Sequence, residues 1–205
     1  MIKHLFHITH LDNLPGILGR GLLCRNRMED LQLTYIDLSD ADCQTRRSWK
    51  ALDGRGVDLH NYVPLFIKPR NAMLYRLQKS LGESGAADAL AILEVNADVA
   101  QWGASLLADG IASSPVTQLF HARDAAGWQA LDWKAIRCRC WLDQPDPQAA
   151  KRRMMAEVMV NGQLQRRHIQ KVWLKSSSAL EELRARLGVD AVPVAAVDQE
   201  RRLFF

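Results

Sequence analysis

The stretch KRRMMAEVMV, residues 151–160, limits the possible folds more strongly than any other segment of the chain. As a strand, it would place Met155, Glu157 and Met159 on one face and the intervening apolar residues on the other. An ionised carboxylate between two methionines is unfavourable unless it is paired or has a function. The stretch therefore predicts a strand with apolar side chains on both faces and one carboxylate that needs a partner or a reaction.

The other segments mix strand and helix patterns without the regular alternation of a parallel α/β fold. Strand patterns occur at 4–11, 60–70, 89–97, 116–122, 168–175, 192–198 and 201–205. Helix patterns occur at 14–22, 40–52, 72–84 and 179–188, and a tryptophan-bearing helix or turn at 124–136. Together they predict a single α+β domain over residues 1–205, with a curved, mainly antiparallel sheet and flanking helices.

The first strand pattern, HLFHITHL, has two distinct faces. Leu5, His7 and Thr9 alternate onto one face, and Phe6 and Ile8 onto the other. The sequence thus predicts that one side of this strand carries polar groups and the other side is apolar.

Turn and cap residues predict where several elements begin and end. Asp12 is expected to cap the helix at 14–22, with Pro15 in its first turn. Gly19 or Gly21 is expected to end that helix. Pro64 is expected to interrupt the strand at 60–70 because it lacks the N–H of a strand residue.

Positive charge gathers in two regions, although the net charge of the 205-residue chain is only +4. Seven cations lie between residues 151 and 175 against Glu157 alone: Lys151, Arg152, Arg153, Arg166, Arg167, Lys171 and Lys175. A second group lies in the polar, poorly periodic segment 26–61: Arg46, Arg47, Lys50 and Arg55. Such groups are either solvated faces or surfaces that bind phosphates, and charge alone leaves both interpretations open.

Several classes of protein do not fit the sequence. No apolar run approaches the ~20 residues of a membrane span, and the N-terminal residues lack the apolar core of a signal peptide. A cytoplasmic protein is therefore expected. The four cysteines have no zinc or redox spacing, which predicts reduced structural thiols. No metal site is expected, since His4, His7 and His10 have no nearby acid pair, and no P-loop or dinucleotide fingerprint is present.

Several motifs in a fixed order resemble the DarT family of DNA ADP-ribosyltransferase toxins. FHITHLDNLPGILGRGLL resembles the opening segment of the family, and HNYVPLFIKPRNAMLY resembles a second segment. DGIASS, LDW, KRRMMAEVMV and the terminal RRLFF follow in the order of the family. The resemblance spans nearly the whole chain. Phe66, Asn71, Ala72 and Ile111 depart from residues common in the family, which affects fine specificity more than reaction type.

The resemblance implies a diphtheria-toxin-like fold, a split antiparallel sheet that holds NAD as co-substrate in its cleft. Glu157 and Arg47 are implied as catalytic residues, with Arg46 as the alternative to Arg47. The implied NAD-binding residues are His7, Ile8, Thr9, Gly16, Arg47 and Phe66. For five of these residues a structural role is the alternative: a salt bridge from Glu157 to Arg152 or Arg153, a sheet histidine at His7, a core phenylalanine at Phe66, helix-start geometry at Gly16, or a solvated loop arginine at Arg47.

The reaction implied is transfer of ADP-ribose to a base of single-stranded DNA, with thymine favoured, as a toxin that blocks replication. The resemblance also implies a macrodomain antitoxin, similar to DarG, as partner. The cations expected to bind DNA are Arg46, Lys151, Arg152, Arg153, Arg166 and Arg167. Two alternatives stay open: the same fold acting on guanine in DNA or on RNA, and an inactive nucleic-acid-binding module.

Overall fold

The structure, a computed structural model, describes residues 2–47, 50–86, 88–188, 195–199 and 202–205. Its strands are β1 (His4–His10), β2 (Leu22–Leu23), β3 (Lys50–Leu52), β4 (Arg55–Val57), β5 (Tyr62–Phe66), β6 (Leu90–Asn96), β7 (Leu106–Ala108), β8 (Leu119–His121), β9 (Glu157–Asn161), β10 (Gln163–Leu164), β11 (Ile169–Leu174) and β12 (Ala195–Val197). Its helices are α1 (Leu14–Arg20), α2 (Arg25–Asp30), α3 (Ala41–Arg47), α4 (Ala72–Glu83), α5 (Ala125–Ala130), α6 (Trp133–Arg137), α7 (Pro147–Arg153) and α8 (Ser177–Leu187). Short 3-10 turns are η1 (Leu11–Asn13), η2 (Leu59–Asn61), η3 (Ala97–Gln101) and η4 (Arg166–His168).

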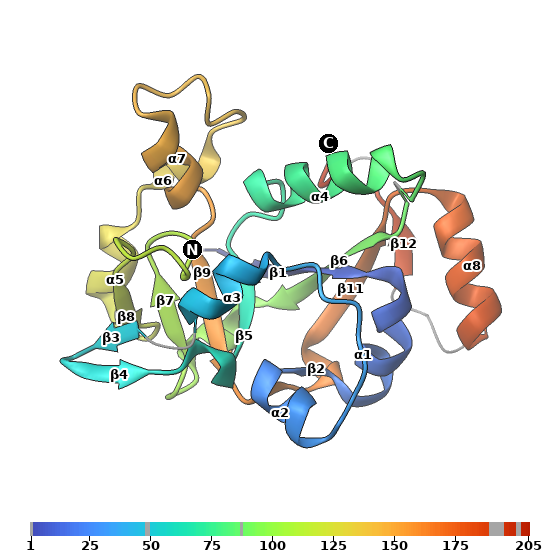
Figure 1. Cartoon of the computed structure of the whole chain (residues 1–205), viewed down its shortest axis with the longest axis horizontal. Helices are drawn as coiled ribbons and strands as arrows, with labels where there is room; N and C mark the ends of the chain where they lie inside the picture. Colours follow the sequence, from blue (N-terminus) through green and yellow to red (C-terminus); the bar gives the residue numbers. More distant parts are fainter. Residues whose placement is uncertain (1, 48–49, 87, 189–194, 200–201) are drawn as a thin grey trace.

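One eight-stranded sheet organises these elements, in the order β12-β11-β6-β1-β5-β9-β7-β8 (Figure 1). Neighbouring strands are antiparallel except β11 and β12, which are parallel. Two small antiparallel pairs, β10 with β2 and β3 with β4, lie outside this sheet. The mainly antiparallel α+β fold expected from the sequence is confirmed.

The sheet is split between β1 and β5. The whole of β1 pairs with β6, and the whole of β5 pairs with β9, but β1 and β5 pair only at Phe6 and Phe66. Proline is tolerated in a strand where its missing N–H has no partner, and the split leaves β5 with little pairing on its β1 side. The expectation that Pro64 interrupts this strand is therefore wrong: β5 continues through it.

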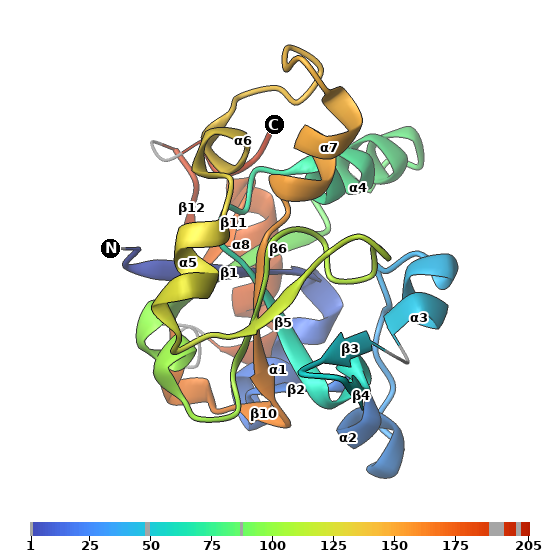
Figure 2. The same ribbon diagram turned by 90° about the vertical axis from the view of Figure 1, so that its left-hand side faces the viewer.

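Helices cover both faces of the sheet and close two apolar layers. Leu5 packs into one layer together with residues of α1 and α8, whereas Phe6 and Ile8 pack into the other together with residues of α4. The β9 residues alternate in the same way, with Val158 in the first layer and Met155, just before the strand, in the second. Figure 2 shows α4 and α8 lying over different parts of the sheet. Both alternations predicted from the sequence are confirmed.

Local signals predicted some element ends incorrectly. Asp12 lies inside η1, and the residue before α1 is Asn13, which makes no side-chain cap bond. Gly21 ends α1 with a φ of 88°. It is one of the two glycines predicted to end this helix. Lys151 to Arg153 form the last turn of α7 and are not part of the strand, because Asp146 caps a helix there and Pro147 occupies its first position.

Two further expectations concern the polar segment 26–61 and the end of the chain. The helix expected over 40–52 ends at Arg47, and Lys50 begins the β3–β4 hairpin. The strand expected over 192–198 is present at Ala195–Val197, while 192–194 lie outside the described residues. Residues 202–205 are not a strand, and Arg201 lies outside the described part. No helix in the described ranges is long and apolar enough to cross a bilayer.

Candidate active site

A cavity of about 280 Å³ opens where β1 and β5 separate. Its walls are β1, α1, α2, the segment 33–39, α3 and the beginning of β5. His7, Thr9 and Gly16 border it, as expected from the sequence, and so does Ile8. The split in the sheet therefore produces the cleft that the resemblance implied.

His7 has a defined hydrogen-bonding state in this cavity. Its Nδ1 lies 2.9 Å from the carbonyl oxygen of Pro64 across the split. A carbonyl only accepts, so Nδ1 carries the proton and Nε2 is left as an acceptor. Burial lowers the pKa of His7, and the bond to Pro64 opposes this only partly. The neutral ring thus offers one lone pair to a donor in the cavity.

Glu157 lies at the first residue of β9 and is 1% exposed. Its Oε1 accepts a hydrogen bond from the backbone N–H of Ala112 at 3.0 Å. Its Oε2 accepts one from Nη1 of Arg47 at 3.2 Å. A buried carboxylate with charged and backbone donors is satisfied as an anion. The salt bridge to Arg152 or Arg153 considered from the sequence is wrong: Glu157 pairs with Arg47, while Arg152 pairs with Asp109 and Arg153 with Asp132.

Of the two arginines considered from the sequence, Arg47 and not Arg46 reaches Glu157. Arg47 borders the cavity and also reaches Sδ of Met159 with Nη2 at 3.6 Å. Arg46 is exposed and contacts Sγ of Cys43 within α3. Helical geometry turns consecutive side chains about 100° apart, so only one of the two can face the sheet.

The turn that supplies the N–H to Glu157 is held by Arg152. Nη1 of Arg152 donates to Oδ1 of Asp109 at 2.8 Å and to Oγ1 of Thr117 at 3.0 Å. The backbone oxygen of Arg152 accepts from the N–H of Ile111 at 3.0 Å. Arg152 therefore holds the chain on both sides of Ala112. The sequence had led us to expect Arg152 on an exposed surface that binds DNA.

The remaining cations of that expected DNA surface do not form one patch. Arg153 pairs with Asp132 at 3.1 Å, and Lys151 is exposed beside it on α7. Arg166 and Arg167 lie in η4, directly after β10, and Figure 2 shows α7 and β10 at opposite ends of the molecule. The run of cations in the sequence is thus divided between two separate surfaces.

Phe66 is the expected NAD-binding residue that does not border the cavity. The catalytic candidate Glu157 does not border it either, but its partner Arg47 does. It is 6% exposed and packs in the apolar layer with Phe6. Tyr62 and Pro64, which share its strand face, border the cavity instead. The structure gives Phe66 the core role that was the alternative, and it identifies Tyr62 as a cavity residue missed in the sequence.

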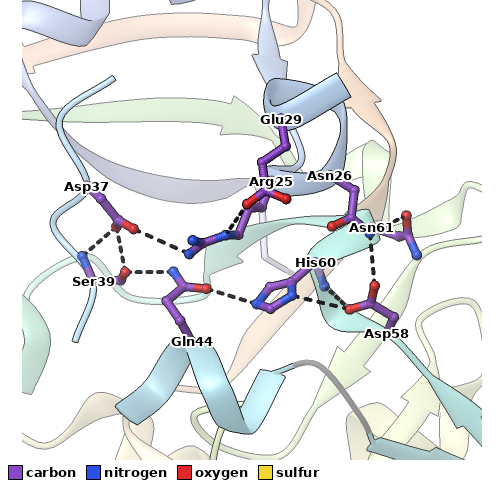
Figure 3. A network of polar contacts seen from close by, with 9 residues as sticks. All are labelled: Arg25, Asn26, Glu29, Asp37, Ser39, Gln44, Asp58, His60 and Asn61. Atoms are coloured by element: carbon purple, nitrogen blue, oxygen red, sulfur yellow. Dashed lines mark hydrogen bonds and ion pairs between the residues drawn. The ribbon is translucent and has the colours of Figure 1, made fainter. Parts of the chain in front are cut away.

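Polar contacts missed in the sequence hold α3 over the cavity (Figure 3). Gln44, one turn before Arg47, lies with Oε1 3.1 Å from Nε2 of His60. Nε2 of Gln44 also donates to Oγ of Ser39 at 2.6 Å. The backbone N–H of His60 in turn donates to Oδ1 of Asp58 at 2.9 Å. The three-residue spacing of Gln44 and Arg47 was the only available signal in the sequence.

Comparisons with known proteins give the family. A family model described as ssDNA thymidine ADP-ribosyltransferase, DarT, matches residues 6–205. The chain belongs to the DarT family. The DNA ADP-ribosyl transferase of Thermus sp. (strain 2.9) is 33% identical over 147 residues, which are 69% of this chain and 68% of that protein. The resemblance stated from the motifs is therefore confirmed.

One longer relative is named as a fusion of a DNA ADP-ribosyl transferase with a second enzyme. The DNA ADP-ribosyl transferase-DNA ADP-ribosyl glycohydrolase fusion protein of Thermosipho africanus (strain H17ap60334) is 26% identical over 193 residues. That match covers 94% of this chain and 47% of the fusion protein. The chain thus spans about half the length of this relative.

Solved DarT structures share the fold. Thermus sp. 2.9 DarT in complex with ADP-ribosylated ssDNA superimposes with a TM-score of 0.80 at 24% identity, covering 100% of this chain and 97% of that one. Thermosipho africanus DarTG in complex with ADP-ribose gives a TM-score of 0.77 at 25% identity, covering 99% of this chain and 51% of that one. The split sheet of this chain is accordingly the DarT fold.

Proposed function

We propose that residues 1–205 act as one NAD-dependent ADP-ribosyltransferase domain that modifies a thymine base in single-stranded DNA. The observation that carries this proposal is Glu157, a buried carboxylate held by the N–H of Ala112 and by Arg47, which borders the cavity. Membership of the DarT family and the ligands named for its solved members, which include NAD+ and ADP-ribosylated ssDNA, support it.

The reaction requires stabilisation of positive charge on a sugar. The bond between C1′ of the ribose and the nicotinamide nitrogen breaks, and its electron pair leaves with nicotinamide. The oxocarbenium-like centre that develops at C1′ is stabilised by a nearby carboxylate, as in glycoside cleavage. Glu157 is the acid that the resemblance implies for this role, and its partner Arg47 borders the cavity.

The second half of the reaction forms a bond from C1′ to a ring nitrogen of the base. That nitrogen carries a proton, and it attacks only as the proton leaves. Each carboxylate oxygen of Glu157 accepts one hydrogen bond and retains a further lone pair. Glu157 is therefore also able to accept the proton of the base.

The cavity residues suit the parts of NAD that do not react. Nε2 of His7 is an acceptor for a ribose hydroxyl or the carboxamide N–H, and Thr9 adds a hydroxyl beside it. A Cβ at Gly16 would meet no atom within 4 Å beyond its own helix backbone and chain neighbours, so there is open space beside this glycine at the border of the cavity. The guanidinium of Arg47 is placed to contact a phosphate or the incoming base.

The cellular setting follows from this activity. A cytoplasmic enzyme that marks single-stranded DNA bases would block replication and act as a toxin. Its expected partner is a macrodomain antitoxin similar to DarG, which removes the mark. The fusion of transferase and glycohydrolase in the Thermosipho relative supports this pairing.

The test is transfer to defined oligonucleotides. Wild-type protein, NAD and a thymine-containing oligonucleotide are expected to give a product heavier by one ADP-ribose, and Glu157→Gln is expected to give none. Homopolymers of each base, with RNA counterparts, separate thymine from guanine and DNA from RNA as acceptor. An inactive binding module would bind DNA in a salt-sensitive way and release no nicotinamide; that result would overturn the proposal.

A further inference from the structure

An aromatic cluster lies on the surface of α4, outside the cavity. Tyr75 is 46% exposed. Its ring centroid lies 5.6 Å from that of Trp141 and 5.4 Å from that of Phe205, both edge to face. Phe205 is also exposed, while Trp141 is half-buried. Exposed apolar patches on a surface mark interaction sites when their side chains are contiguous. We refer to Tyr75, Trp141 and Phe205 as the aromatic platform.

Positive charge is concentrated in the segment that carries Tyr75. From Phe66 to Leu81 the chain contains four cations and no acid: Lys68, Arg70, Arg76 and Lys79. The guanidinium carbon of Arg70 lies 4.5 Å from the ring centroid of Phe205. Nε of Arg70 is buried and has no hydrogen-bond partner among the described residues. The platform thus combines ring faces with cations that acids of the same segment do not neutralise.

The platform is connected to the proposed active site through the core. Trp141 packs against the apolar layer that contains Phe66 and Met155. Phe66 is the register partner of Glu157 in the β5–β9 pair, and Met155 precedes Glu157 by two residues.

The helix α4 also reaches the cavity. Met73 borders the cavity, and Nη2 of Arg76 donates at 3.1 Å to the carbonyl oxygen of Leu38, another cavity residue. One helix therefore contributes both to the cavity wall and, through Tyr75, to the platform. In Figure 1, α4 begins beside the central strands β5 and β9.

Aromatic rings set among cations match the chemistry of a single nucleic-acid strand. Bases stack on aromatic side chains, and Lys and Arg follow the phosphates. From Phe66 to Leu81 the segment that carries Tyr75 supplies cations for phosphates and no acid for the cations of a protein partner. We propose that the aromatic platform is a stacking site for bases of single-stranded DNA that flank the modified base. This inference rests on the proposed function and adds to it a binding site outside the cavity.

The first test measures the transfer reaction of Tyr75→Ala and Tyr75→Phe with long and short acceptors. For an oligonucleotide of about twenty bases, Tyr75→Ala should raise KM for DNA about tenfold, as expected for the loss of one base–aromatic stack. Its kcat and its KM for NAD should not change, and Tyr75→Phe should restore the wild-type KM. A thymidine monomer as acceptor, which has no flanking base to stack on the platform, should react equally with all three proteins. An unchanged KM for the long acceptor in Tyr75→Ala would overturn the proposal.

The second test separates this inference from the proposed function. Binding of a fluorescent oligonucleotide is measured with Glu157→Gln alone and with Glu157→Gln combined with Tyr75→Ala, so that no turnover is needed. About tenfold weaker binding by the double variant supports the platform even if the wild type transfers nothing. Equal binding overturns it. Dissociation of a dimer by Tyr75→Ala, seen by sedimentation, together with unchanged DNA binding, would also overturn it and would indicate a second copy as occupant.

Discussion

Nη1 of Arg47 lies 3.2 Å from Oε2 of Glu157, and the two side chains are 11% and 2% exposed. The pair joins the end of α3 to the first residue of β9, across 110 positions of sequence. A buried carboxylate needs such a partner, because its desolvation is not otherwise offset. The same contact brings the cation to the border of the cavity, so one interaction serves both stability and the proposed chemistry.

Loss of this arginine should reduce both activity and stability. We expect Arg47→Ala to lower kcat/KM by at least about a hundredfold, because a charged group at the reacting centre is lost. The free energy of unfolding should fall by about 3 kcal/mol, because Glu157 stays buried without its cation. Oligonucleotide transfer and urea unfolding measure the two effects. Arg46→Ala is the matched control, and a loss of equal size there would contradict the assignment.

The placement of α3 should depend on Gln44. Gln44→Leu removes both its contact with His60 and its bond to Ser39, so that α3 is held less firmly over the cavity. We expect kcat to fall about tenfold, since small displacements of a reacting group have large effects on rate. Gln129→Leu, at an exposed position of α5, is the control and should leave kcat unchanged.

A rescue experiment distinguishes this positioning role from a general loss of structure. Gln44→Glu keeps an acceptor toward His60 and should recover part of kcat. If the loss of kcat came from a general loss of structure, the thermal stability of both variants would fall equally. If Gln44→Leu had a wild-type kcat, the network in Figure 3 would have no influence on the site.

The turn that holds Ala112 should tolerate no side chain at Gly110. A Cβ there would lie 2.9 Å from the backbone oxygen of Arg152 and 2.5 Å from its Nη1. Gly110→Ala should therefore displace the turn, destabilise the protein by about 1–3 kcal/mol and lower kcat. Thermal unfolding and the transfer assay check this. At Gly103 a Cβ would meet nothing within 4 Å, and Gly103→Ala should be close to neutral in both measurements.

His7 should make stability depend on pH. Burial lowers its pKa in the folded state below the ordinary value of about 6.5. The unfolded chain then binds the proton more readily, so stability is full above pH 6.5 and decreases as the pH falls from there through the folded pKa. His7→Asn should remove this part of the pH dependence, seen by comparing urea unfolding of both proteins at pH 7.5 and pH 5.

Protonation of His7 should also weaken the binding of NAD. A proton on Nε2 converts the cavity acceptor into a donor, so KM for NAD should rise with falling pH in the wild type. An identical pH profile in His7→Asn would show that another group is responsible.

The sequence by itself determined the family, the alternating faces of β1 and β9, and the presence of a buried acid at Glu157. These features depend on local periodicity and on motif order, which are properties of the chain without its fold. Only the tertiary structure decided that Arg47 and not Arg46 reaches Glu157, that Arg152 holds a turn, and that Phe66 lies in the core while Tyr62 borders the cavity. Such roles depend on which strands pair and where the sheet splits. Those contacts join residues up to 110 positions apart, and no local pattern specifies a contact over that separation.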